Sequence, residues 1–335
     1  MSSPISFQAI RIFEEDGKFE QRIVERSTGD LPEGEVLIQV HFSSLNYKDA
    51  LSASGNRGVT RNYPHTPGVD ASGIVAASTD PDFKAGASVI VTSYDLGMNT
   101  DGGFGEYIRV PATWVLPLPE GLTLQEAMIY GTAGFTAAQS FWELQTAGCK
   151  PENGPVLVTG AAGGVGSIAV RLLLKGGYEV AAVSGHDTGK SLLKELGVQQ
   201  ILDRKDAVDD GNRPLLKTQW NGVIDNVGGL PLSTALKTTK PGGVITTCGN
   251  VAGAELSTTV FPFILRGLRL IGIDSQNCPY DLRKKLWGLL ATDWKLPNQN
   301  AGLKEVSMEE MMNEIVLILR SEVKGRVVLR HMAAG

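Results

Sequence analysis

Residues 156–166 read VLVTGAAGGVG, and this stretch decides the fold. A short apolar run leads into three glycines spaced G-x-x-G-x-x-G, namely Gly160, Gly163 and Gly166, and apolar residues at helical spacing follow. The pattern predicts a strand, a tight turn and a helix whose first N–H groups can approach a pyrophosphate, because glycine has no Cβ. The alternative is a glycine turn that only lets helix and strand pack closely. The second apolar strand expected at 179–184 favours the dinucleotide interpretation.

Length and composition bound the class of protein. A chain of 335 residues is long enough for about two domains that each bury a core. Its formal charge of −5 argues against broad nucleic-acid binding. We see no secretory signal and no apolar run of about 20 residues, so we expect no membrane partner. Cys149, Cys248 and Cys278 have no paired spacing, and we interpret them as buried reduced thiols of a cytoplasmic protein.

The first 125 or so residues are β-rich by alternation and turn signals. The segment 122–144 has helical periodicity that is broken near Gly131 and Gly134. Candidate strands of the β-rich part are 36–44, 72–78 and 87–93, with a glycine turn entering a strand over 102–110.

Strands and helices then alternate, which predicts a doubly wound parallel sheet. Two further helices and a last strand follow, and if they rejoin the first domain the α/β unit is an insertion. The candidate strands are 155–160, 178–185, 222–228, 242–249 and 269–274, the candidate helices lie near 164–175, 188–196, 231–239 and 261–266, and the last three elements are 280–292, 308–320 and 325–330.

The end of the second strand of this sheet predicts the coenzyme. An acidic residue there would bind the adenosine ribose and favour NAD, but the position is Ser184. Arg204 and Lys190 are near in sequence, and a hydroxyl with cations suits a 2′-phosphate. We therefore predict NADPH. Two alternatives stay open: a shifted register could bring Asp187 to the ribose, and the two basic residues could be ordinary surface charges.

No metal centre is expected. Catalytic zinc needs three converging Cys, His or Glu ligands, and structural zinc needs four closely spaced Cys or His. We interpret His41, His65 and His331 as paired or surface side chains. No G-x-S-x-G, phosphate-loop lysine or catalytic triad is evident. These observations leave a zinc-free, nicotinamide-dependent redox enzyme.

NYKDAL (46–51) precedes the glycine loop, and FPFILRG (261–267) and GIDS (272–275) follow it. With these and seven further motifs in order, the whole chain resembles the medium-chain dehydrogenases/reductases, and within them the zinc-free quinone-oxidoreductase-like branch that includes acryloyl-CoA reductase. Where zinc-dependent relatives keep a ligand cysteine and a Gly-His-Glu run, this chain has Asn46–Asp49 and Pro67–Asp70. The motifs are NYKDAL (46–51), PGVDASG (67–73), DGGFGEY (101–107), GTAGFTAAQS (131–140), VTGAAGGVG (158–166), SGHD (184–187), CGNVAG (248–253), FPFILRG (261–267), GIDS (272–275) and KGR (324–326).

The resemblance implies an α/β protein with a GroES-like β-rich catalytic domain, split between residues 1–125 and 276–335. An inserted Rossmann domain over 126–275 would bind NADPH, in a cleft between the two domains. Relatives are often homodimers, and 269–274 is the candidate edge strand for such pairing. By position, the implied cofactor residues are Tyr47, Ala162, Gly163, Gly164, Val165, Gly166, Ser184, Gly185, His186, Arg204, Asn250, Ile264 and Ser275. The family usually has Arg where His186 stands, and its Asn250 position is often apolar.

The implied reaction is conjugate reduction: hydride from NADPH attacks the β-carbon of an activated alkene, while negative charge grows on the carbonyl oxygen. Tyr47 is the catalytic candidate, because its hydroxyl can donate to that oxygen; packing against the cofactor is its alternative role. We interpret Asn46 and Asp49 as helix caps and Lys48 as a solvated charge rather than a substrate contact.

Three functions compete with reduction of a short enoyl thioester such as acryloyl-CoA. One is reduction of quinones or small enones on the same scaffold. Another is NADPH binding without catalysis, as in a redox-responsive regulator. A zinc alcohol dehydrogenase is a distant fourth. Arg57 and Arg61, in a glycine-containing loop, could meet CoA phosphates, although loop arginines are more often plain surface.

Overall fold

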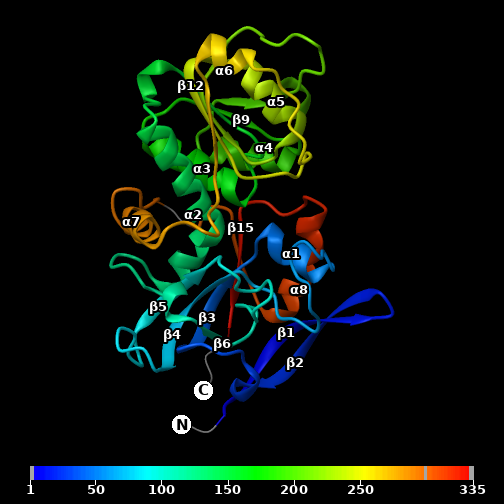
Figure 1. The fold of residues 1–335 in the computed structure, drawn as a ribbon, viewed down its shortest axis with the longest axis vertical. Helices are drawn as coiled ribbons and strands as arrows, with labels where there is room; N and C mark the ends of the chain where they lie inside the picture. The colour runs from blue at the N-terminus through cyan, green and yellow to red at the C-terminus, as the bar shows by residue number, and fades with distance from the viewer. Residues whose placement is uncertain (1–3, 298–299, 332–335) are drawn as a thin grey trace. The chain divides into compact units, whose positions relative to one another are not determined.

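The computed structural model describes residues 4–297 and 300–331, and the chain forms two compact units (Figure 1). Unit 1 comprises Met1–Thr132, Gln276–Thr292 and Asn298–Gly335, and unit 2 comprises Ala133–Ser275 and Asp293–Pro297. The first division falls inside the long helix α2 (Leu124–Thr146). Our predicted domain boundary, 125/126, coincides instead with the start of that helix.

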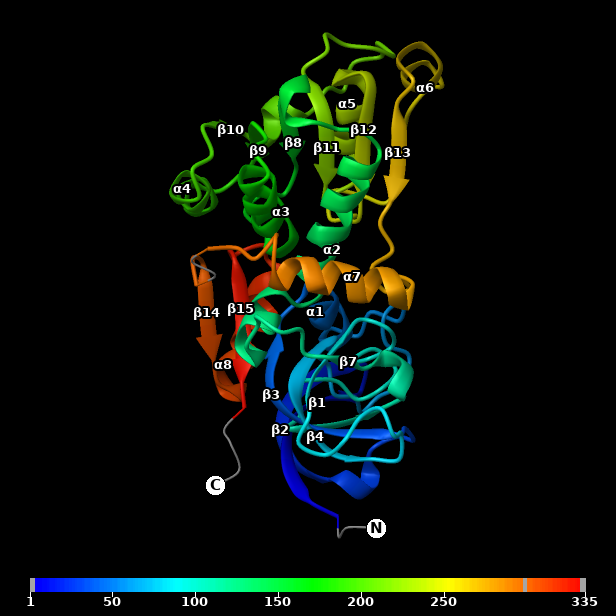
Figure 2. The same ribbon diagram turned by 90° about the vertical axis from the view of Figure 1, so that its left-hand side faces the viewer.

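Unit 2 is built on a parallel sheet. In its described residues the strand order is β10-β9-β8-β11-β12-β13, which in order of appearance along the chain is 3-2-1-4-5-6 (Figure 2). The order therefore reverses beside β8, the position at which open α/β sheets bind ligands. The strands are β8 (Val156–Val158), β9 (Val180–Val183), β10 (Gln200–Leu202), β11 (Trp220–Asp225), β12 (Thr239–Thr247) and β13 (Arg269–Gly272).

Helices cover both faces of this sheet, as near-continuous apolar strands require. On one face, Leu157, Val223 and Ile245 share a buried cluster with Leu236 of α5. On the other, a Cβ at Gly222 would lie 3.4 Å from Leu144 of α2. The helices of this unit besides α2 are α3 (Gly164–Lys175), α4 (Asp187–Glu195), α5 (Gly229–Thr238) and α6 (Phe261–Arg266), with 3-10 turns at Pro151–Asn153 and Arg204–Ala207.

Unit 1 is β-rich. Its sheet has the order β14-β15-β3-β4-β5-β7, with β6 also paired to β3, and a separate hairpin joins β1 to β2. Strand β15 is antiparallel to β3, with Val328 opposite Ser44, so the C-terminal segment completes the N-terminal sheet. The strands are β1 (Ser6–Glu15), β2 (Lys18–Ser27), β3 (Val36–Ser44), β4 (Asp70–Ser78), β5 (Ser88–Thr92), β6 (Tyr107–Val110), β7 (Leu116–Pro117), β14 (Leu303–Val306) and β15 (Arg326–Arg330).

Three helices belong wholly to unit 1, within its described residues: α1 (Tyr47–Ala53), α7 (Tyr280–Ala291) and α8 (Met308–Leu319). Unit 1 also has 3-10 turns at Thr28–Asp30, between β2 and β3, and at Ala112–Trp114, between β6 and β7. Met311 and Ile315 of α8 pack in one buried cluster with Leu45, Ala50 and Leu329. Along the described chain, no helix combines the length and the apolar composition that crossing a bilayer requires.

The sequence patterns missed three parts of unit 1: the β1–β2 hairpin, the two-residue strand β7 and β14. Strand β2 reads KFEQRIVERS and β14 reads LKEV, so charged side chains interrupt the apolar alternation from which strands are recognised. The predicted break in the 122–144 helix was half right. The helix α2 is interrupted at Gly131, with φ 51° and ψ −157°, but it continues through Gly134.

The interruption at Gly131 is filled by a buried polar cluster. The carboxylate of Asp70 accepts hydrogen bonds from the backbone N–H of Thr132 (2.9 Å), from Ser44 Oγ (2.5 Å) and from Asn46 Nδ2 (2.7 Å). Arg326 lies against the same residues: its Nε donates to the carbonyl of Ile129 at 2.9 Å. The carboxylate therefore caps the second segment of α2, where a helix has unpaired N–H groups.

We predict that Gly131→Ala destabilises the protein strongly. A Cβ there would lie 2.3 Å from Ser44 Oγ and 2.4 Å from Asp70 Oδ2, at a positive φ. The free energy of unfolding, measured from urea denaturation, should fall by about 2–4 kcal/mol. Gly86→Ala is the matched control, because Gly86 also has positive φ (87°) but a Cβ there meets nothing within 4 Å. It should cost about 1 kcal/mol, and equal losses in both variants would contradict the account.

Candidate dinucleotide site

The glycine loop joins β8 to α3 in unit 2. Gly160 has φ 57°, which favours glycine, and a Cβ at Gly166 would lie 2.3 Å from the carbonyl oxygen of Gly160. Close packing alone therefore explains these two glycines. Gly163 is different: it has an ordinary φ of −76°, and the nearest atom to a Cβ there would be Gly160 O at 3.3 Å.

Gly163 is the N-cap residue of α3, and it has no side chain to accept from the first turn. Ala162, Gly164, Val165 and Gly166 flank it in the loop and the first turn. The N–H groups at this helix start carry partial positive charge and suit an anion such as a pyrophosphate. The bare backbone at Gly163 leaves room for such a group to approach.

The end of β9 lies beside this loop. The N–H of Ala161 donates to the carbonyl of Val183 at 3.1 Å, and Ser184 follows directly. A Cβ at Gly189, in α4, would lie 2.5 Å from Ser184 Oγ and 2.8 Å from Ala162 Cβ. The start of α4, the end of β9 and the glycine loop therefore meet, as the adenosine end of a dinucleotide site requires.

A histidine and an arginine lie next to Ser184. The guanidinium Nη2 of Arg204 is 3.3 Å from Nε2 of His186, and a Cβ at Gly185 would lie 2.4 Å from Arg204 Nε. The structure thus brings Ser184, Gly185, His186 and Arg204 together. The ammonium of Lys190 is paired with Asp203, the residue before Arg204.

Asp187 occupies the first helical position of α4, after the N-cap residue His186. It does not end β9, whose last residue is Val183. The strand end therefore carries Ser184, and the register shift that would have put an acid there is not what the structure shows.

A buried aspartate organises the neighbouring strand ends, and the sequence reasoning missed it. Asp225, fully buried at the end of β11, accepts from Thr159 Oγ1 (2.7 Å), Thr247 Oγ1 (2.8 Å) and the N–H of Gly228 (3.0 Å). It holds the ends of β8, β11 and β12 together. An acidic residue closing the apolar run GVID was the available signal.

Asn250 and Ser275 follow the ends of β12 and β13. The loop holding Asn250 packs on Gly228, where a Cβ would lie 3.2 Å from Asn250 Cα, so this predicted residue also lies at the strand ends. The hydroxyl of Thr136 donates to Ser275 Oγ at 2.8 Å, which attaches Ser275 to α2.

Ile264, also predicted as a cofactor residue, lies apart from the other predicted residues of unit 2. Arg266, two residues later in α6, donates to the carbonyl of Thr239, the first residue of β12. Figure 2 shows α6 at the tail of β13, away from its arrowhead. The glycine loop follows the opposite end of the strands, and the side chain of Ile264 is 67% exposed.

In unit 1, Tyr47 is the first residue of α1 and is half-buried. The predicted cap is present: Asp49 Oδ2 accepts from the N–H of Asn46 at 2.7 Å. The Asn46 amide turns instead to Asp70. Lys48, expected to be solvated, donates to Gln276 Oε1 at 2.8 Å. The helix that carries Tyr47 is thus fixed at its start by buried carboxylates.

Asp49 has a second role beside Asp70. Its Oδ1 accepts from the N–H groups of Val69 (2.8 Å) and Gly68 (3.2 Å). Burial, and then the charge of Asp70, raise the pKa of Asp49 to about 7. Asp49 therefore holds together the backbone at the start of α1 and the loop before β4.

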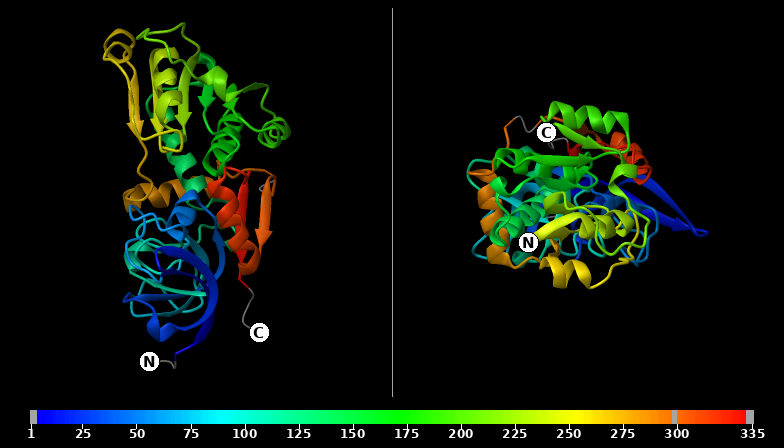
Figure 3. Two further views of the ribbon diagram at one scale, coloured as in Figure 1. Left: turned by 90° about the vertical axis from the view of Figure 1, so that its right-hand side faces the viewer. Right: turned by 90° about the horizontal axis from the view of Figure 1, so that it is seen from above.

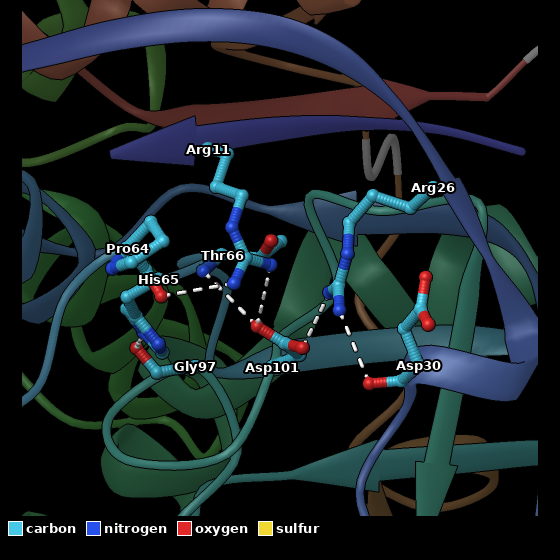
Figure 4. A network of polar contacts seen from close by, with 8 residues as sticks. All are labelled: Arg11, Arg26, Asp30, Pro64, His65, Thr66, Gly97 and Asp101. Atoms are coloured by element: carbon cyan, nitrogen blue, oxygen red, sulfur yellow. Dashed lines mark hydrogen bonds and ion pairs between the residues drawn. The ribbon is translucent and has the colours of Figure 1, made fainter. Parts of the chain in front are cut away.

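The DGGFGEY segment lies against the same loop. Figure 4 shows Asp101 between two guanidinium groups, with an ion pair to Arg26 and another to Arg11 at 3.5 Å. The Asp101 carboxylate also accepts from the N–H of Thr66 at 3.3 Å, and His65 Nε2 is 2.9 Å from the carbonyl of Gly97. This network is structural: it fixes the loops that precede β4 and β6.

The remaining histidines and the loop arginines belong to unit 1. His331 is buried with Nε2 2.8 Å from the carbonyl of Gly103, and His41 is half-buried. Over residues 4–297 and 300–331, no three His, Cys, Asp or Glu side chains gather as a metal site would need. Arg57 is paired with Glu14 and donates to the carbonyl of Arg61 at 2.7 Å.

The cysteine prediction needs one change. All three cysteines are free thiols in the described chain, and Cys149 and Cys278 are buried, but Cys248 is only half-buried. It follows β12 at the strand ends, where its Sγ lies 3.3 Å from Asn226 Oδ1.

One unit has the strand order 3-2-1-4-5-6 with a glycine loop at its switch point, and the other is a β-rich unit completed by the C-terminal segment. Together they define a dinucleotide-dependent dehydrogenase or reductase architecture. Comparison with models of known protein families agrees with this class. A family model described as an alcohol dehydrogenase GroES-like domain matches residues 32–120, and one described as a zinc-binding dehydrogenase matches residues 164–292.

Relatives that match nearly the whole chain narrow this class of enzymes to one family. YhfP of Bacillus subtilis, whose name assigns it to the quinone oxidoreductases, is 44% identical over 326 residues, 97% of this chain and 98% of that protein. Acrylyl-CoA reductase AcuI of Ruegeria pomeroyi is 42% identical over 94% of this chain and 96% of its own. The chain belongs to the medium-chain dehydrogenase/reductase family, in its quinone-oxidoreductase-like branch.

Solved structures agree with this assignment. The yhdH oxidoreductase of Salmonella enterica, solved in complex with NADP, has a TM-score of 0.94 at 42% identity and covers 97% of this chain and all of its own. YhfP, solved with NAD bound, also has a TM-score of 0.94, at 43% identity, covering 98% of this chain and 100% of its own. The predicted fold class, a GroES-like β-rich domain with a Rossmann domain, is confirmed.

Proposed function

We propose that this protein is an NADPH-dependent reductase of activated alkenes, with short enoyl thioesters such as acryloyl-CoA as its substrate class. In this proposal unit 2 is the NADPH-binding domain, and unit 1, with Tyr47, is the catalytic domain. The observation that carries it is Gly163. Its φ does not demand glycine, and a Cβ there would meet one atom within 4 Å, the carbonyl oxygen of Gly160 at 3.3 Å. A ligand that approaches the start of α3 gives a further reason for the missing side chain.

The described residues fit NADPH rather than NADH. The pyrophosphate would accept hydrogen bonds from the N–H groups at the start of α3. The 2′-phosphate would bind to Ser184, His186 and Arg204, which lie together at the end of β9. No carboxylate stands at that strand end to favour an unphosphorylated ribose. The relatives solved with NADP support this choice, although YhfP was solved with NAD.

NADPH, when bound, supplies a hydride for the β-carbon of the alkene. The chain's own task is to orient the alkene, exclude water and stabilise negative charge on the carbonyl oxygen. Tyr47 is proposed to donate its hydroxyl to that oxygen. The capping of α1 by Asp49 and the anchoring of Asn46 on Asp70 would hold Tyr47 in place.

Reduction of quinones or small enones is the second candidate, and the name carried by YhfP favours it. The same coenzyme site serves both reactions, so only the substrate pocket separates them. NADPH binding without turnover is the third.

We also propose that the protein is a homodimer that pairs through β13 and α6 of unit 2. Strand β13 forms one edge of the described sheet (Figures 2 and 3). Beside it, Val260, Phe261, Ile264 and Leu265 are exposed, three of them by more than 60%. Such a patch beside an open edge suits an isologous interface. A cytoplasmic location would suit three reduced thiols.

The function is tested by a turnover panel. NADPH and NADH oxidation would be followed with acryloyl-CoA, a quinone and a simple enone. We expect NADPH oxidation with acryloyl-CoA to be fastest, as judged by kcat/KM. Faster turnover of the quinone would favour the second candidate, and binding without oxidation of NADPH would favour the third.

Gly163→Ala should separate coenzyme binding from packing. We expect about a tenfold or larger rise in the Kd for NADPH by calorimetry, because the added methyl would meet the ligand. The thermal unfolding midpoint should change little. The matched control is Gly197→Ala, with φ 92° and nothing within 4 Å of a Cβ, which should leave the Kd unchanged. Unaltered NADPH affinity in Gly163→Ala would count against the site.

Tyr47→Phe should lower turnover by about one to three orders of magnitude with nearly unchanged NADPH affinity, since only the hydrogen bond to the developing oxyanion is lost. Steady-state kinetics and calorimetry measure the two quantities. If kcat is unchanged, Tyr47 has no part in the chemistry and only packs.

A double variant, Ile264→Glu with Leu265→Glu, should convert the dimer to a monomer in light scattering, because charges would replace buried apolar side chains. Val316→Glu, at an exposed position of α8 in unit 1, is the control and should remain dimeric. A wild-type protein of monomeric mass would refute the proposed pairing.

A further inference from the structure

The contact between His186 and Arg204 fixes a protonation state. A guanidinium has donors and no acceptor, so at 3.3 Å from Arg204 Nη2 the Nε2 of His186 must be the acceptor. His186 is then neutral, with its proton on Nδ1. Both side chains belong to exposed residues, so solvent and ligands can reach them.

Other charged groups surround the pair, on α4 and on the 3-10 turn that carries Arg204. Lys190 is held by Asp203, and that pairing raises the pKa of Lys190 and lowers the pKa of Asp203. Asp206 accepts from the N–H of Asp203 at 3.3 Å. Asp187 is next to His186 in sequence, and Lys205 is next to Arg204. Arg204 is therefore the charged group in contact with the imidazole.

A proton added at Nε2 would remove this hydrogen bond and place two cations in contact. An anion bound between the two side chains makes protonation of His186 favourable instead, because the imidazolium and the guanidinium could then both donate hydrogen bonds to the anion. Anion binding and protonation of His186 are therefore mutually stabilising, as linkage requires of two ligands that favour each other. The usual arginine of the family would carry its charge at every pH; His186 does not.

We propose that His186 makes recognition of the coenzyme's 2′-phosphate depend on a proton, so that selection of NADPH over NADH weakens as pH rises. This inference rests on the proposed function, since it concerns the same site. It assigns His186 as a specificity-determining residue that favours NADPH only when its imidazole is protonated.

The sign follows from the charge. Histidine is charged at the lower end of the range from about pH 5 to 8 and neutral at the upper end. The extra attraction is thus present at the lower end of that range and is lost towards the upper end. NADH has no 2′-phosphate, so its affinity should be flat. The phosphate itself gains a proton near pH 6, which confines the test to higher pH.

Calorimetry of the full chain with NADPH and with NADH, at about pH 6.5, 7.5 and 8.5, tests this. We expect the NADPH Kd of the wild type to rise about five- to tenfold over that range while the NADH Kd stays constant. Titrations in two buffers of different ionisation enthalpy should show proton uptake on NADPH binding near neutral pH and none on NADH binding.

His186→Arg should bind NADPH tightly with little pH dependence and no proton uptake, and His186→Asn should bind it weakly with little pH dependence. His41→Asn, a half-buried histidine of unit 1, is the control and should behave as wild type. The inference is overturned if His186→Arg keeps the pH dependence of the wild type, or if wild type takes up no proton. Binding of neither coenzyme at any pH would instead overturn the proposed function.

Discussion

The buried carboxylate of Asp70 is the interaction on which unit 1 depends. It sits at the start of β4 and receives hydrogen bonds from β3, from the residue before α1 and from the resumed segment of α2. Arg326, at the start of β15, closes the cluster from the C-terminal segment. A carboxylate out of water is stable only when so fully bonded. Four distant stretches of chain must therefore be in place together.

This cluster also links fold to chemistry. Tyr47 heads a helix whose first turn is fixed by Asp49, and Asp49 is itself bonded to the backbone of Val69, one residue before Asp70. In unit 2, Asp225 has the equivalent position: buried, at a strand end, bonded to both neighbouring strands. In each unit a buried carboxylate organises the loops that carry the proposed binding residues.

The parts predicted well from sequence are those specified locally. The strand–glycine loop–helix unit and the alternating strands and helices of unit 2 are written in short windows of sequence, through periodicity and glycine spacing. What was missed depends on partners far along the chain. The β1–β2 hairpin is masked by charged residues, and the roles of Asp70 and Asp225 appear only when distant strands meet. Ile264 was placed by resemblance alone, and the structure puts it at the other end of its sheet.

The reactivity of the cysteine thiols matters in an enzyme of this proposed kind. Activated alkenes are electrophiles that add to sulfur, and the thiolate, not the thiol, is the attacking form. Burial raises the pKa of Cys149 to about 11, and burial with the charge of Asp225 raises that of Cys248 to about 12. Both sulfurs therefore stay protonated in neutral solution. A protonated thiol is a weak nucleophile, which disfavours alkylation of Cys149 and Cys248 by the compounds that the protein is proposed to consume.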